Sequence, residues 1–119
     1  MVDVIGFFND IIKYVYIYRA VCLNEYLSII DISKFTLHLR KTSVKYFGLN
    51  FDETLLFANK AFNLDIVAIF EVKLKEKDLN QVGDFTKTDP FLFRTGTVEI
   101  QEENLDQFNE YIIKINHIY

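Results

Sequence analysis

The chain has few of the residues that cross-link, interrupt or loosen a polypeptide. Its 119 residues include one cysteine, one proline, four glycines and no tryptophan. The single cysteine, Cys22, excludes an intrachain disulfide and a multi-cysteine zinc site, so a reducing compartment is expected. The scarcity of glycine and proline argues against long disordered linkers, and the length suits one core. We therefore expect a single domain over residues 1–119.

Positive charge is also in short supply. The chain has 13 Lys and Arg residues against 17 Asp and Glu residues, for a net charge of −4. This balance does not favour nucleic-acid binding, which depends largely on neutralising phosphates. Near the start, Asp3 stands where a secretory signal has a basic residue, and Asp10 interrupts the apolar run well short of membrane-spanning length. We expect a soluble, cytoplasmic protein without a membrane segment.

Apolar residues are abundant and fall into short periodic stretches. Alternation and β-branched runs predict strands at residues 15–21, 34–40, 44–47, 66–74, 91–93 and 96–100. Helical spacing and capping residues predict helices at residues 4–14, 24–30, 50–62, 75–83 and 103–116, with a polar connection at 84–90. This order of elements predicts an α+β domain of short strands with helices at its edges.

The strand predicted at 15–21 carries one cation, Arg19, among β-branched and aromatic residues. A guanidinium group seldom enters such a place without a partner. Arg19 is therefore expected either to form a structural ion pair with a carboxylate or to face a ligand from the strand end. The chain's one basic cluster, HLRKTSVK at residues 38–45, could hold NAD phosphates or an RNA target, but a solvated strand face is the favoured interpretation.

Several short motifs follow one another in a recognisable order between Tyr18 and Ile100. YRAV precedes a short helix, KYF is followed by the helix LLFANKAF, and GTVEI comes after a central strand. This pattern resembles the compact ADP-ribosyltransferase fold of small toxin and effector domains from bacterial polymorphic toxins and phages. The resemblance implies that NAD is the substrate and that a macromolecule, protein or nucleic acid, accepts the ADP-ribose.

The resemblance also assigns roles to individual residues. Arg19 would contact the NAD pyrophosphate and ribose, because its planar fork suits phosphate oxygens. The nicotinamide would pack against Tyr46 or Phe47, which as strand neighbours point to opposite faces. The family's Ser-Thr-Ser motif is absent here, and Ser43 just upstream is its substitute in the cofactor-binding set. Glu99, in a G-x-x-E arrangement, would be the catalytic carboxylate that orients the ribose beside an oxocarbenium-like transition state.

Each of these residues also has a structural interpretation. One of the two rings at Tyr46 and Phe47 is expected in the core, and Glu99 also fits a solvated edge strand. His38 and His117 have no cysteine or carboxylate companions at ligand spacing, so no metal cofactor is expected.

The alternative function is a non-catalytic module that binds a cognate protein partner. An immunity protein, an antitoxin or a phage-encoded inhibitor would fit this description, and the apolar face of the helix predicted at 4–14 suits such a role. Geometry separates the two hypotheses. The transferase needs Arg19, Tyr46 and Glu99 to line one cleft, and it fails if Arg19 and Glu99 lie on opposite sides of the sheet.

Overall fold

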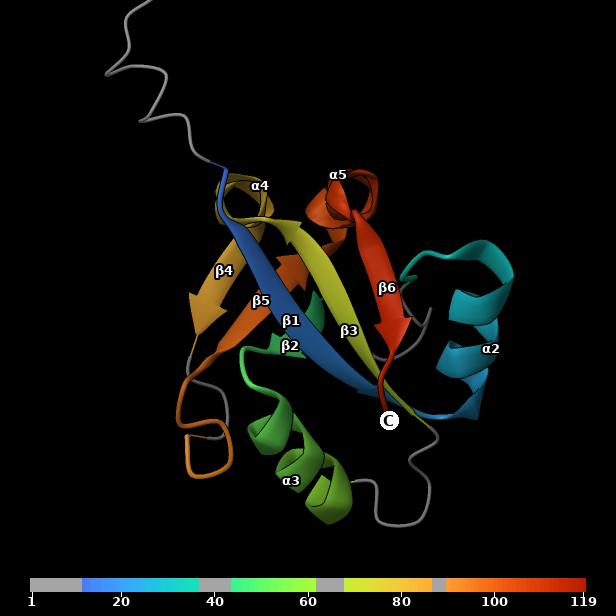
Figure 1. Cartoon of the computed structure of the whole chain (residues 1–119), viewed down its shortest axis with the longest axis vertical. Coiled ribbons are helices and arrows are strands. Elements are labelled where there is room, and N and C mark those ends of the chain that lie inside the picture. The colour runs from blue at the N-terminus through green and yellow to red at the C-terminus, as the bar shows by residue number, and fades with distance from the viewer. Residues whose placement is uncertain (1–11, 37–43, 62–67, 87–89) are drawn as a thin grey trace, which may run out of the picture.

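A six-stranded antiparallel sheet with helices on both faces forms the structure (Figure 1). This computed structural model describes residues 12–36, 44–61, 68–86 and 90–119. The strands are β1 (Tyr14–Val21), β2 (Val44–Gly48), β3 (Ala68–Lys75), β4 (Gly83–Thr86), β5 (Thr97–Gln101) and β6 (Lys114–His117). The helices are α2 (Leu23–Ile32), α3 (Phe51–Ala61), α4 (Glu76–Val82), the short 3₁₀ helix η2 (Glu102–Asn104) and α5 (Leu105–Tyr111). The predicted α+β class is confirmed.

The strand order is β4-β5-β2-β1-β3-β6, and the pairing between β1 and β2 is very short. Strand β1 pairs with β3 along its whole length, from Tyr14 opposite Lys75 to Val21 opposite Ala68. Its pairing with β2, in contrast, is confined to Tyr18 opposite Gly48. The sheet therefore has two well-paired halves, β4-β5-β2 and β1-β3-β6, that meet at a single residue pair and separate on either side of it.

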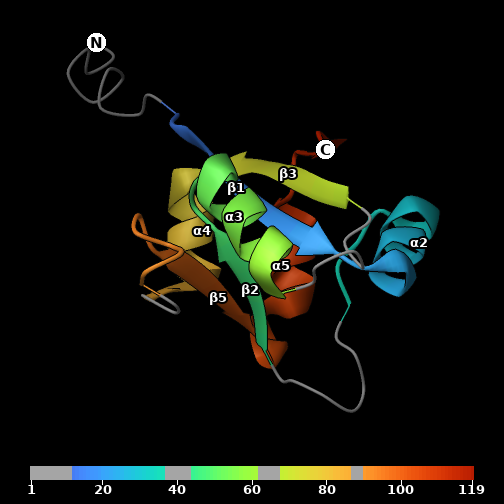
Figure 2. The same cartoon turned by 90° about the horizontal axis from the view of Figure 1, so that it is seen from below.

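Two apolar clusters lie on opposite faces of this sheet. The larger one joins the inward residues of β1, β3 and β5 to α2, α4 and α5. It contains a triad of rings, Phe35, Phe47 and Phe108, whose centroids lie 5.1 to 6.1 Å apart. The smaller cluster joins Ala20 and Ile69 to α3, which crosses the other face (Figure 2). Alternation along each strand thus decides which helix a side chain meets.

Helix α3 begins where the capping residues predict. The Glu53 main-chain N–H donates to the Asn50 side-chain oxygen over 3.0 Å. The Glu53 carboxylate does not bond back to the Asn50 main chain to complete a capping box. It instead accepts hydrogen bonds from the main-chain N–H and the hydroxyl of Thr95, at 2.9 and 2.6 Å. The cap therefore also ties the loop before β5 to the start of α3.

The last predicted helix, 103–116, is wrong in its second half. Helix α5 ends at Tyr111, and the chain then forms β6, which pairs with β3 from Phe70 opposite His117 to Lys73 opposite Lys114. The apolar spacing of Ile112 and Ile115 suits either structure, and both residues pack against the larger cluster. Main-chain pairing with the outer edge of β3 decides in favour of the strand.

Two other segments also differ from their predictions. The expected polar connection at 84–90 begins as strand β4, because pairing with β5 from Gly83 opposite Ile100 to Thr86 opposite Thr97 outweighs its polar sequence. The expected strand at 91–93 is turn and coil, and Gly96 follows it with a φ of 106°, which favours glycine. The predicted helix at 4–14 and strand at 34–40 lie outside the described residues except at one end. Those described ends differ from the predictions, because Tyr14 belongs to β1 and residues 34–36 are not a strand.

Candidate functional site

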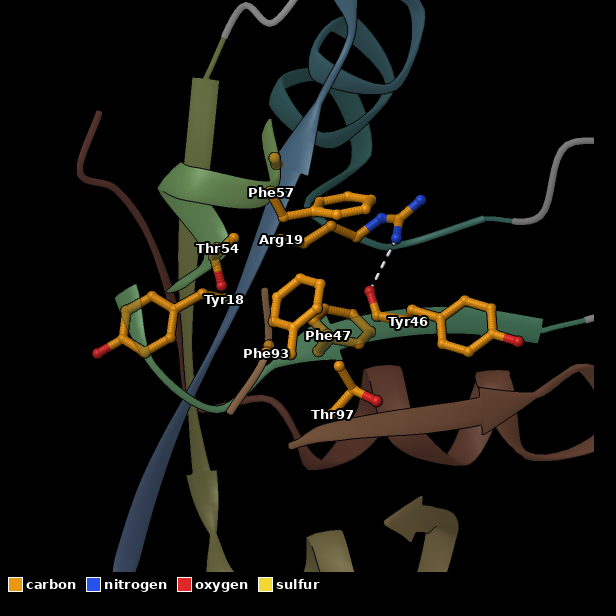
Figure 3. A pocket seen from close by; sticks show the side chains of 10 residues that line it. Tyr18, Arg19, Tyr46, Phe47, Thr54, Phe57, Phe93 and Thr97 are labelled. Atoms are coloured by element: carbon orange, nitrogen blue, oxygen red, sulfur yellow. Dashed lines mark hydrogen bonds between the residues drawn. The ribbon is translucent and has the colours of Figure 1, made fainter. Parts of the chain in front are cut away.

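Arg19 lies where β1 and β2 separate, and each of the three nitrogens of its guanidinium group donates a hydrogen bond. Nε and Nη2 donate to the two carboxylate oxygens of Glu25, at 2.5 and 3.0 Å. Nη1 donates to the main-chain carbonyl of Tyr46 over 2.8 Å (Figure 3). The pair is mostly buried, with 22% and 21% of the two side chains exposed. Of the two roles expected for Arg19, the structural ion pair is the one formed here.

Lys45, on β2, joins Arg19 and Glu25 in one charged cluster. Its Nζ lies 3.4 Å from Glu25 Oε2 and donates to the carbonyl of Thr36, and the side chain is only 4% exposed. The expectation of a solvated basic face at 38–45 is therefore wrong for Lys45, and residues 38–43 of that cluster lie outside the described residues. Burial raises the pKa of Glu25, but the hydrogen bond and charge of Arg19, with a smaller effect of Lys45, hold it below its usual range. Two cations thus share one buried carboxylate.

The pKa of Lys45 falls to about 8, because burial penalises the ammonium, the Arg19 charge adds to the penalty and Glu25 only partly offsets it. The folded chain therefore releases this proton near pH 8, whereas an unfolded lysine keeps it to about pH 10.5. Because the unfolded state binds more protons in this window, we expect the unfolding free energy to rise by about 1–2 kcal/mol between about pH 8 and 10. Above that range the raised pKa values of Tyr18 and Tyr46 act in the opposite direction.

Urea unfolding across this pH range checks the expected rise. The Lys45→Met variant should lose it, and Lys60→Met, which changes an exposed lysine on α3, should keep it. Parallel pH profiles of the wild type and Lys45→Met would contradict the assignment.

A cavity of about 310 Å³ opens beside this cluster, under α3. Its lining comes from β1, β2, α3, the loop before β5 and β5 itself: Tyr18, Arg19, Ala20, Tyr46, Phe47, Gly48, Thr54, Phe57, Phe93 and Thr97. In Figure 3 the rings of Phe57 and Phe93 lie next to each other in this lining, with centroids 5.0 Å apart. The cavity exists because the two strands diverge after their single residue pair.

Tyr46 and Glu99 are direct neighbours on paired strands. Tyr46 is 39% exposed, and in Figure 3 its ring points away from the rings of Phe57 and Phe93. Burial and then the adjacent Glu99 carboxylate raise the pKa of the Tyr46 hydroxyl. Glu99 accepts a hydrogen bond from the Gln101 side-chain amide over 3.3 Å and does not line the cavity. These side chains form a polar strip on the open part of the sheet.

The structure brings only part of the predicted site together. Arg19, Tyr46 and Phe47 line one cavity, but Phe47 is 1% exposed and belongs to the ring triad of the larger cluster. Along β5, Glu99 alternates with residues of the larger cluster and so faces the side of α3. On β1, Arg19 lies on the side of the larger cluster, and its guanidinium group bonds to Glu25 of α2. Arg19 and Glu99 therefore lie on opposite sides of the sheet. Ser43 lies outside the described residues.

Sequence reasoning missed Glu25, the partner of Arg19, and Lys45, the second cation beside that carboxylate. A carboxylate partner was expected in general terms, and Glu25 lies six residues further on, on the helix that follows β1. Lys45 offered no such signal, because a buried lysine is rare.

A second hollow, of about 460 Å³, lies beside the unpaired part of β1. The Lys13 carbonyl accepts a hydrogen bond from the Glu76 N–H over 2.9 Å, at the side where β1 meets β3. Main-chain groups alternate along a strand, so those of Tyr14 and Tyr16 point to the other edge. On that edge, within the described residues, the one strand partner of β1 is Gly48, opposite Tyr18. The hollow's lining includes Tyr14, Tyr16, Leu49, Phe85 and Glu76.

The outer face of α2 is a further apolar surface. Leu23, Leu27 and Ile30 recur at helical spacing and are each more than half exposed. Ile29, on the other face, is buried in the larger cluster. The helix is therefore apolar on both its covered and its uncovered side, as is common where a partner binds.

Comparison with known proteins found no matching family model, no matching curated protein and no matching solved structure. The resemblance to ADP-ribosyltransferases accordingly stays a prediction. In the described part of the chain, no helix is long and apolar enough to cross a membrane. The described residues also contain no group of three or more His, Cys, Asp or Glu side chains placed to hold a metal ion.

Proposed function

We propose that this domain is a non-catalytic module that binds an extended segment of a partner protein along the open edge of β1. One observation carries the proposal: the main-chain groups of Tyr14 and Tyr16 face an edge without a strand partner among the described residues. Such an edge is a ready template for pairing with another chain. Addition of a partner strand is a recurrent mode of peptide recognition.

The side chains around this edge support the same function. Tyr14, Tyr16 and Phe85 are each more than 40% exposed and line the hollow beside it. A partner strand could therefore gain main-chain hydrogen bonds and bury alternate apolar side chains against these rings. Glu76 is the one charged residue among those that line the hollow. A partner segment with a lysine or arginine at the α4 end would complement it.

The second candidate function is ADP-ribosyl transfer from NAD. In its favour, Tyr46 and Glu99 are cross-strand neighbours beside a cavity that Arg19 also lines. Against it, Arg19 and Glu99 lie on opposite sides of the sheet, whereas the transferase needs them in one cleft. The one cation in that lining also already pairs with Glu25, which leaves the two negative charges of a pyrophosphate without a partner. Calorimetric titration with NAD, with nicotinamide release followed in the same samples, separates the candidates. Release that is lost in Glu99→Gln would establish the transferase.

Selection from a displayed library of short random peptides tests the proposed module. We expect enriched sequences with alternating apolar residues. The selected peptide should bind Tyr16→Pro at least about tenfold more weakly than the wild type, because proline removes the main-chain donor that faces the open edge and leaves the pairing with β3 in place. Fluorescence anisotropy of the labelled peptide measures the dissociation constant.

The matched control is Tyr16→Val, which removes the ring but keeps the main-chain N–H and a strand-forming residue. Its affinity should fall less than that of Tyr16→Pro. Equal binding by Tyr16→Pro and Tyr16→Val, or no enriched peptide at all, would rule out strand addition at this edge.

A further inference from the structure

We infer that the cavity between α3 and the β1–β2 separation is a binding site for a small, neutral aromatic molecule. This inference is independent of the proposed protein partner, because the cavity and the open edge of Tyr14 and Tyr16 lie at different parts of β1. It rests on the shape of the cavity, the chemistry of its lining and the partners that its polar groups already have.

Rings dominate the walls of this cavity. Phe57 comes from α3, Phe93 from the loop before β5 and Phe47 from β2 (Figure 3). Phe57 and Phe93 contact each other at a tilt of 42° and both line the cavity. Aromatic ligands gain from offset or edge-to-face contacts with such rings in addition to the burial of apolar surface. Ala20 also lines the cavity, and a larger side chain at this position would take up part of the space.

The polar groups of the lining are already bonded within the protein. The Thr54 hydroxyl donates to the Asn50 carbonyl over 2.8 Å. The hydroxyls of Thr97 and Thr86 share a hydrogen bond of 2.6 Å. Arg19 pairs with Glu25 and donates to the Tyr46 carbonyl. Lys45, the second cation beside Glu25, does not line the cavity. A charged ligand would find no unpaired group of opposite charge in this lining, whereas a neutral ligand loses little solvation free energy when it enters. A weak N–H donor on the ligand could still bond to a remaining lone pair of a threonine hydroxyl.

The volume limits the size of the ligand. At about 310 Å³ the cavity is near the lower end of the range for small-molecule sites. An apolar cavity of about 150 Å³ is large enough to bind benzene. A cavity twice that size suits a bicyclic molecule such as indole, while a dinucleotide is too large and too highly charged.

Titration with indole tests the inference, with benzoate as the charged aromatic control. In NMR spectra of the wild type, indole should shift the methyl resonances of Ala20, Thr54 and Thr97 by its ring current, and leave that of the remote core residue Leu79 unchanged. Calorimetry should give indole an affinity at least about tenfold higher than that of benzoate, since the benzoate charge has no partner.

Variants then locate the site. Ala20→Leu, which fills the cavity, should abolish indole binding, while Leu56→Ala, at an exposed position on the same helix as Phe57, should leave it unchanged. If Ala20→Leu does not fold, the methyl shifts of the wild type still test whether indole binds in this cavity. The inference is overturned if indole shifts none of the three methyls, or if benzoate binds as tightly as indole.

Discussion

The Phe47→Ala variant will lose about 3–5 kcal/mol of unfolding free energy, the range for truncating a buried ring. Phe47 is 1% exposed, and its ring lies 5.1 Å from the ring centroids of both Phe35 and Phe108. Removal of the ring leaves a space in the middle of the larger cluster, with the charged group of Arg19 at its margin. Urea denaturation followed by circular dichroism measures the loss.

The adjacent residue provides the matched control. Tyr46 lies on the same strand but faces the other side of the sheet and is 39% exposed. Its truncation to alanine should cost less than about 1 kcal/mol, as for a surface substitution. Similar losses for Phe47→Ala and Tyr46→Ala would contradict the described orientation of β2, because a slip of one residue exchanges the two rings.

Replacing Glu25 with alanine is expected to cost about 2–4 kcal/mol, toward the lower part of the range for breaking a buried ion pair, since the group is partly exposed. The reason is the number of groups that depend on it. Glu25 accepts both Nε and Nη2 of Arg19 and lies 3.4 Å from the buried ammonium of Lys45. Its removal leaves two cations close together without an anion, and their mutual repulsion adds to the unpaired burial.

Two further variants make this result specific. Asp31→Ala removes an exposed carboxylate from α2 and should change the unfolding free energy by less than about 0.5 kcal/mol. In the second variant, Glu25→Ala combined with Lys45→Met, the additional loss of one cation should recover part of the stability. A cost for Glu25→Ala no larger than that for Asp31→Ala would mean that the cluster contributes little to the fold.

The sequence allowed the elements with strong local signals to be predicted. Three local patterns, each a few residues long, indicated the correct structure: the β-branched run at β1, the Asn50 cap of α3 and the apolar stretch of β3. The same signals place Arg19 at a strand end and predict that one of the rings at Tyr46 and Phe47 lies in the core. These are local properties, set by periodicity and by a neighbour three or four residues away.

The remainder depends on contacts between residues distant in sequence. The chain from Ile112 to His117 has apolar spacing that fits a helix, and only the outer edge of β3 makes it a strand. Likewise, the burial of Lys45 follows from the positions of Glu25 on α2 and the Thr36 carbonyl, which no spacing within β2 indicates. The separation of β1 from β2 after one residue pair, which creates both hollows, is equally invisible in the sequence.

Amide hydrogen exchange at β1 is the most direct test of the proposed binding edge. The amides of Val15 and Ile17 face β3 and should be strongly protected, whereas those of Tyr14 and Tyr16 face the open edge and should exchange far faster. Alternating protection along these four residues is the predicted result. Equal protection of Tyr16 and Ile17 in the isolated domain would contradict the account, because the edge would then already be covered.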